Sequence, residues 1–205
     1  MDIVQVIQNL QTERTIFYNE ADLQFSLALA IMKLYPEAKI RLERAFGNSY
    51  IDILVELANK KYPIEIKYKT RELKVTVNGE DFKTRNQGAQ DLGKYSFIQD
   101  LVRLESLTDK VGNLSKGYAI WVTNDASYWN PPKNQNVGYA AFSVHNGALK
   151  TGSMSWGPNI NMDSLKNKEK TLCLKNDYTI SWENYSTVSS SPGGQFKYSL
   201  NCVFY

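Results

Sequence analysis

The pattern of apolar and polar positions along the chain predicts an α/β protein. Apolar residues recur every three to four positions over 20–34 and 87–106, which is typical of amphipathic helices, and a shorter helix is predicted near 2–10. Asn19 is a suitable N-cap, and Pro36 ends the helix because proline disfavours helical geometry in the residue before it. Four strands are predicted in the same part of the chain, over 39–44, 50–57, 62–69 and 118–123.

Turn residues indicate how these strands connect. A turn at 58–60 joins 50–57 to 62–69, which makes the two strands antiparallel neighbours. Residues 74–77 run into Asn78-Gly79, the pair that supplies the positive φ angles of a two-residue hairpin turn.

The nearly continuous apolar run 118–123 predicts a strand covered on both faces. After it, short aromatic-rich strands are expected at 137–144, 171–174, 178–182 and 196–204. The order predicts an α/β core, with a central mixed β-sheet flanked by helices, and a β-rich C-terminal extension.

Polar side chains interrupt two of the apolar strands. Glu65, Lys67 and Lys69 fall on one face of 62–69, because side chains alternate along a strand. Asp52 lies between Ile51 and Ile53, and hairpin pairing of the two strands can bring it beside Glu65. Two carboxylates and an ammonium group could then converge. The alternative explanation is a solvent-facing strand with a surface salt bridge.

Polar residues also occur on the apolar faces of both long helices. Glu20 falls on the face defined by Leu23 and Leu27, although an acid in the first turn also stabilises the helix dipole. In 87–106, Asp91 falls within the apolar stripe and Gln87 at its edge. Local backbone groups at the start of the helix are the alternative partners of these two side chains.

Composition excludes several classes of protein. A chain of 205 residues with 42% hydrophobic residues fits one domain, residues 1–205, and is neither disordered nor fibrous. One histidine and two distant cysteines argue against zinc and disulfide frameworks. No apolar run reaches the length of a membrane span and no signal-like segment opens the chain, so a cytoplasmic protein without membrane contact is expected.

The net charge of +3 is too small to indicate a partner, but the charge is unevenly distributed. Residues 60–85 contain eight basic and four acidic side chains, a local excess larger than that of the whole chain. A solvated hairpin of mixed charge is the alternative to a phosphate-binding segment.

The order and spacing of four features resemble the PD-(D/E)XK nuclease superfamily. These features are Glu20 on a helix, Asp52 on a strand, Glu65-Ile66-Lys67 on the next strand, and a later helix bearing glutamine and tyrosine. The resemblance covers residues 17–124, the nuclease-like core, and leaves 125–205 as an extension of the same domain. It implies a restriction-endonuclease-like fold that hydrolyses phosphodiester bonds, in DNA rather than RNA. Asp52 and Glu65 would be metal ligands, Lys67 the catalytic lysine and Glu20 an accessory acid.

The chemistry of this family implies a cofactor and a partner. Asp52, Glu65 and the backbone carbonyl of Ile66 would hold Mg²⁺, with Mn²⁺ as a substitute, and Lys67 would orient or deprotonate the attacking water or stabilise the developing charge. Phosphate contacts are expected from the basic segment, namely Lys69, Arg71, Lys74, Lys83 and Arg85.

The sequence departs from the family pattern in two places. Ile51 stands where a proline normally precedes the first aspartate. In the later helix, Asp91 occupies the glutamine position of the Gln-x-x-x-Tyr pattern that ends at Tyr95, which leaves the roles of Gln87, Asp91 and Tyr95 open.

Two other functions stay open. One is a catalytically silent adaptor that keeps the nuclease fold and binds nucleic acid or protein. The other is a β-rich ligand module built on aromatic residues such as Trp156 and Trp182. Endonuclease or exonuclease action and formation of a homodimer are also undecided.

Overall fold

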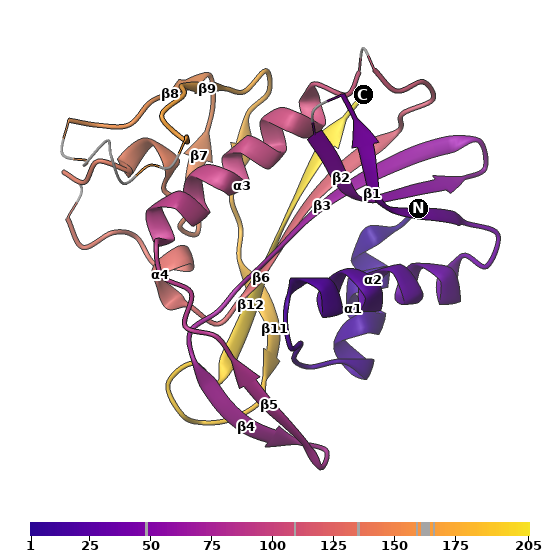
Figure 1. Cartoon of the computed structure of the whole chain (residues 1–205), viewed down its shortest axis with the longest axis horizontal. Coiled ribbons are helices and arrows are strands. Elements are labelled where there is room, and N and C mark those ends of the chain that lie inside the picture. The colour runs from indigo at the N-terminus through magenta and orange to yellow at the C-terminus, as the bar shows by residue number, and fades with distance from the viewer. Residues whose placement is uncertain (48, 109, 135, 159, 161–164, 166) are drawn as a thin grey trace.

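A computed structural model describes residues 1–205 except 48, 109, 135, 159, 161–164 and 166. Its centre is a six-stranded mixed sheet in the order β1-β2-β3-β6-β12-β11 (Figure 1). Neighbouring strands are antiparallel except for β3 and β6, which run parallel. The six strands are β1 (Lys39–Phe46), β2 (Ser49–Leu57), β3 (Lys60–Lys69), β6 (Lys116–Thr123), β11 (Glu183–Thr187) and β12 (Gln195–Phe204).

Helices cover both faces of this sheet. Helices α1 (Ile3–Glu13) and α2 (Glu20–Leu34) pack on one face, and α3 (Gln90–Glu105) crosses the other (Figure 1). A two-stranded hairpin, β4 (Leu73–Val77) and β5 (Glu80–Thr84), projects from the end of β3. Asn78 and Gly79 have the positive φ angles that its two-residue turn requires.

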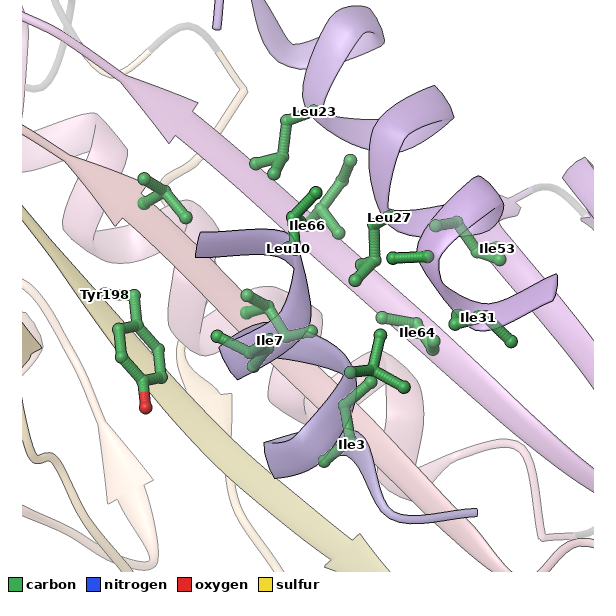
Figure 2. Packing of buried hydrophobic residues seen from close by; sticks show 14 of the residues in the cluster. Ile3, Ile7, Leu10, Leu23, Leu27, Ile31, Ile53, Ile64, Ile66 and Tyr198 are labelled. Carbon is green, nitrogen blue, oxygen red and sulfur yellow. The ribbon is translucent and has the colours of Figure 1, made fainter. Parts of the chain in front are cut away.

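The core on the α1 and α2 face consists of aliphatic side chains from both helices and the central strands. Figure 2 shows Leu23, Leu27 and Ile31 of α2 above Ile53 and Ile64 of the sheet, with α1 packed beside them. Because α2 presents residues spaced by three and four positions, each of these side chains lies over the strands and is at most 1% exposed. This packing fixes α2 across β2 and β3.

The opposite face is covered by α3 and by the C-terminal part of the chain. Trp121 on β6 is fully buried among Phe97, Tyr128 and Trp182. The short elements of this layer are α4 (Ala126–Trp129), a 3₁₀ turn η1 (Ala140–Phe142), β7 (Leu149–Lys150), β8 (Ser153–Met154), β9 (Leu172–Cys173) and β10 (Tyr178–Thr179).

The sequence predicted the elements of the first half well. In the second half the strand at 196–204 is confirmed by β12 and those at 171–174 and 178–182 contain the shorter β9 and β10, whereas β7, β8 and β11 were not predicted. Helix 20–34 agrees in both bounds, and Asn19 caps it by accepting a hydrogen bond from the Asp22 N–H. The strand expected at 137–144 is wrong: only the 3₁₀ turn is regular there, because Phe142 and Val144 are buried against α3 and not within a sheet. The C-terminal extension supplies two central strands, β12 and β11.

Membrane crossing by a helix has no support in the described part of the chain, where no helix is both long and apolar enough to span a bilayer.

The packing of α2 gives a direct stability test. Leu27→Ala removes a side chain that is 1% exposed and leaves a cavity above the sheet, so we expect the free energy of unfolding to fall by about 2–5 kcal/mol. Leu29→Ala on the same helix is the matched control, because Leu29 is 42% exposed and its loss should change stability by about 0.5 kcal/mol or less. Urea unfolding followed by circular dichroism measures both, and equal losses would contradict the packing described.

Candidate functional site

The site begins where β2 separates from β3. Regular pairing of the two strands ends at Ile53 and Ile64, so the next β3 residues on that edge have no strand partner. Side-chain oxygens take the place of the missing strand as acceptors of the β3 N–H groups. Asp52 Oδ2 accepts the Ile66 N–H at 2.7 Å, and Glu20 Oε2 accepts the Tyr68 N–H at 2.8 Å.

A third backbone N–H, just past the end of β3, also donates to a side-chain oxygen. The Thr70 N–H donates to Gln87 Oε1 at 2.9 Å. Residues 66, 68 and 70 are two apart, so their N–H groups point to the same edge of the strand. Three side chains singled out in the sequence, Glu20, Asp52 and Gln87, therefore lie along one strand edge, each satisfying a backbone donor.

Helix α2 and a twist of the β1–β2 pair hold Asp52 at this edge. Ile53 packs on the α1 and α2 side of the sheet, whereas Ile51 packs on the α3 side, so the strand changes face at Asp52. Glu43, beside it on β1, has a positive φ of 49°. Gln24 of α2 donates to the Asp52 backbone carbonyl at 2.8 Å and to the Glu43 carboxylate at 2.7 Å, which ties the helix to the twisted pair.

Glu65 and Lys67 point from β3 toward α3, where each meets a partner of opposite charge. Arg103 Nε and Nη2 donate to the two carboxylate oxygens of Glu65 at 2.7 and 2.5 Å. Lys67 Nζ lies 2.6 Å from Asp100 Oδ2, and Arg103 Nη2 also contacts Asp100 Oδ1 at 2.8 Å. The four side chains form one buried network in which the Glu65 side chain is 0% exposed.

Burial and neighbouring charges shift the pKa values of the side chains in this network. Loss of solvation, together with the charge of Asp100 and against the opposing hydrogen bond from the Ile66 N–H, raises the pKa of Asp52 to about 6. Burial likewise raises the pKa of Glu65, while Arg103 opposes that rise. The charge and hydrogen bond of Asp100 outweigh burial and raise the pKa of Lys67. Lys67 is thus a stable cation.

The charges around the network do not balance. Among the described residues, four carboxylates, of Glu20, Asp52, Glu65 and Asp100, surround the cations Lys67 and Arg103, and Lys168 is a third cation within electrostatic range of Lys67, Asp100 and Arg103. Carboxylate oxygens are the donors that Mg²⁺ and Mn²⁺ prefer, so this donor set fits a hard divalent cation in charge and chemistry. The arrangement is not preassembled, because both Glu65 oxygens serve Arg103 and no three His, Cys, Asp or Glu side chains converge on a metal position in the described residues.

Several predicted nucleic-acid contacts lie beside Glu20. Lys69, Arg85 and Gln87 line one hollow of about 160 Å³ together with Glu20. Arg71 is engaged elsewhere, because its Nε donates to Asp125 Oδ1 at 3.1 Å. The other two predicted contacts, Lys74 and Lys83, are exposed partners on the projecting hairpin.

The residues expected from the later helix do not all reach the site. Tyr95 is buried between Phe142 and Trp156 and donates its hydroxyl to the Lys170 carbonyl. Asp91 accepts the Leu92 N–H next to it. Neither side chain contacts Asp52, Glu65 or Lys67 within the described structure, and Gln87 alone of this group lies at the β3 edge.

The sequence reasoning missed Asp100 and Arg103. The predicted apolar stripe was the one that contains Asp91, but the deeply buried face of α3 includes Leu101 and Leu104. Asp100 and Arg103 flank that face one turn apart, and Asp100 is 3% exposed. An acid and an arginine at this spacing, beside an apolar face, were the available signal.

The raised pKa of Asp52 predicts a pH-dependent stability. Its folded-state pKa, about 6, lies above the ordinary value of 3.8, so the folded protein retains a proton that the unfolded chain releases. The free energy of unfolding should therefore fall as the pH rises from about 4 to 7, by an Asp52 contribution on the order of 1–3 kcal/mol. Asp52→Asn keeps an acceptor for the Ile66 N–H and should remove that contribution. Urea unfolding at pH 4, 5, 6 and 7 measures it, and parallel profiles of the two proteins would contradict the assigned environment.

Comparisons with known proteins leave the family open. No family model matches the sequence, and no curated protein matches it. Among solved structures, the chain is similar to SfsA of Pyrococcus furiosus, solved in complex with Ca²⁺, with 18% sequence identity and a TM-score of 0.26. The match covers 52% of this chain and 63% of SfsA, less than two thirds of that protein. A likeness this low supports no assignment of fold family or activity.

Proposed function

We propose that this protein is a metal-dependent nuclease that hydrolyses phosphodiester bonds, DNA being the preferred substrate, and that residues 17–124 form a restriction-endonuclease-like core. One observation carries the proposal: Glu20, Asp52, Glu65 and Lys67 gather where β2 leaves β3. A buried charge network is costly and contributes little to stability, so the convergence of three carboxylates and a lysine at one strand edge favours a chemical role.

Each residue has a part in the proposed hydrolysis. Asp52, Glu65 and the Ile66 carbonyl would hold Mg²⁺, or Mn²⁺ in its place, and the ion when bound would polarise the phosphodiester and lower the pKa of the attacking water. Lys67 stays protonated beside Asp100, so its ammonium group would orient the water or stabilise the charge that develops on phosphorus oxygens. The water oxygen would bond to phosphorus and release a proton to solvent, the bond to the leaving oxygen would break, and the leaving oxygen would take up a proton from solvent.

Arg103 would control access of the ion to Glu65, because it donates hydrogen bonds to both Glu65 carboxylate oxygens. The ion can use the Glu65 oxygens only after Arg103 leaves them. Arg103 is half-buried and on the last turn of α3, from which a released guanidinium group would be available to a phosphate.

The projecting hairpin supports a nucleic-acid substrate. Lys74 and Lys83 are register partners on β4 and β5, and like charges directly opposite one another destabilise a two-stranded ribbon. Both side chains line a shallow hollow of about 410 Å³. A bound phosphate backbone would offset their repulsion, and Lys69 and Arg85 continue the positive surface toward Glu20.

A second function has a specific observation in its favour. Arg103 neutralises Glu65 with two hydrogen bonds, and Asp52 and Glu20 already satisfy backbone donors of β3. A catalytically silent adaptor that binds nucleic acid or protein would need no more than this arrangement. The two functions differ in metal binding and cleavage.

Cleavage assays distinguish the nuclease from the catalytically silent adaptor. Purified protein is incubated with plasmid and linear DNA in Mg²⁺, Mn²⁺ or EDTA, and we expect cleavage with either ion and none with EDTA. Lys67→Met should reduce the rate at least about 100-fold, because it removes the cation placed beside the reacting groups. Lys116→Met is the matched control, since Lys116 is exposed at the start of β6 and its Nζ lies over the Phe204 ring. Full activity in Lys67→Met would overturn the site assignment, and no cleavage by the unmodified protein would favour the adaptor.

A further inference from the structure

A second positive surface lies at the β1 edge of the sheet, away from the hairpin. It is a hollow of about 350 Å³ beside the end of α3, floored by Leu54 and Val111. Five basic side chains line it and one acid, Glu56, accompanies them. The basic residues, called the β1 basic groove from here on, are Lys39, Arg41, Arg44, Lys61 and Lys110.

The twist of the β1–β2 pair is what gathers these charges. Side chains three apart in a regular strand point to opposite faces, yet Arg41 and Arg44 line the same hollow. The chain turns over between them at Glu43, whose φ is 49°, at the same level as the change of face at Asp52 on β2. The distortion that aims Asp52 at β3 therefore also assembles the groove.

The groove concentrates charge without compensation. None of its five basic residues forms an ion pair with another residue that the structure describes. Arg44 instead lies over the Phe46 ring, 5.6 Å from its centroid. Lysine and arginine on an edge strand discourage pairing between chains, but that purpose does not require Lys61 of β3 and Lys110 beyond α3 to converge on the same hollow.

The position of the groove relates it to the candidate site. Lys61 lines the groove and Lys69 lines the hollow beside Glu20, and the two residues lie near opposite ends of β3. Glu65 and Lys67 lie between them. Eight residues of strand span about 26 Å, which matches roughly seven or eight base steps of a nucleic-acid strand.

We propose that the β1 basic groove binds the phosphate backbone of nucleic acid on the side of the site opposite the β4–β5 hairpin. This inference rests on the proposed function and adds a second set of phosphate contacts to those of the hairpin, near the end of β3 that carries Lys61. The contacts are to backbone phosphates, so they give affinity without sequence preference.

Fluorescence anisotropy with a labelled 20-base-pair duplex in EDTA measures this binding in the absence of cleavage. The triple variant Lys39→Gln/Arg41→Gln/Arg44→Gln should bind at least about tenfold more weakly at 100 mM salt. The slope of log affinity against log salt should decrease in magnitude by about 2–3, as expected for the loss of three phosphate contacts. The control Lys133→Gln/Lys170→Gln/Lys175→Gln removes the same charge from exposed positions outside the groove and should change affinity less than about threefold.

The outcomes separate this inference from the proposed function. Equal losses in the two triple variants, or none in either, would overturn the groove while leaving any observed cleavage intact. Loss confined to the groove variant, in a protein that cuts no DNA with Mg²⁺ or Mn²⁺, would support the groove and overturn the nuclease. Absence of duplex binding by the unmodified protein would overturn the groove, and the cleavage assay with Mg²⁺ or Mn²⁺ alone decides the nuclease. Circular dichroism of the variants, all altered at exposed side chains, verifies that they fold.

Discussion

The departure of β2 from β3 is the constraint on which the site depends. It leaves three successive backbone N–H groups on one edge of β3, and a buried donor without a partner costs about 1–3 kcal/mol. Asp52, Glu20 and Gln87 supply the missing acceptors from a strand, a helix and a loop. A requirement of backbone hydrogen bonding thereby draws side-chain oxygens from three parts of the chain onto one strand edge, along roughly 13 Å of extended chain.

The other consequence is electrostatic. Beyond the pairing with β2, the polar face of β3 meets α3, where Arg103 and Asp100 complete the ion pairs of Glu65 and Lys67. Burial, and to a lesser extent the charge of neighbouring carboxylates, raises the pKa of Asp52 and of Glu65. The twist that places Asp52 at this edge also turns Arg41 and Arg44 toward one hollow. One backbone feature thus organises negative charge at the centre of the sheet and positive charge at its edge.

Local signals in the sequence were sufficient for the elements but not for their long-range partners. Helix 20–34 was predictable because Asn19 caps its start and Pro36 ends it, and the antiparallel pairing of β2 and β3 followed from the turn between them. Asp100 and Arg103 act on Glu65 and Lys67 across more than 30 residues of chain, so no local pattern links them. The segment between 125 and 182 was the least predictable, since its aromatic residues pack on α3 and β6 with little regular structure, whereas the strand at 196–204 was predictable.

The central claim is that Asp52 and Glu65 together bind a divalent cation, and anomalous diffraction from crystals soaked in Mn²⁺ tests it most directly. The account predicts an anomalous peak bonded to the carboxylates of Asp52 and Glu65 and to the Ile66 carbonyl, with Arg103 displaced from Glu65. No peak there at saturating Mn²⁺, with Arg103 still bonded to both Glu65 oxygens, would contradict it.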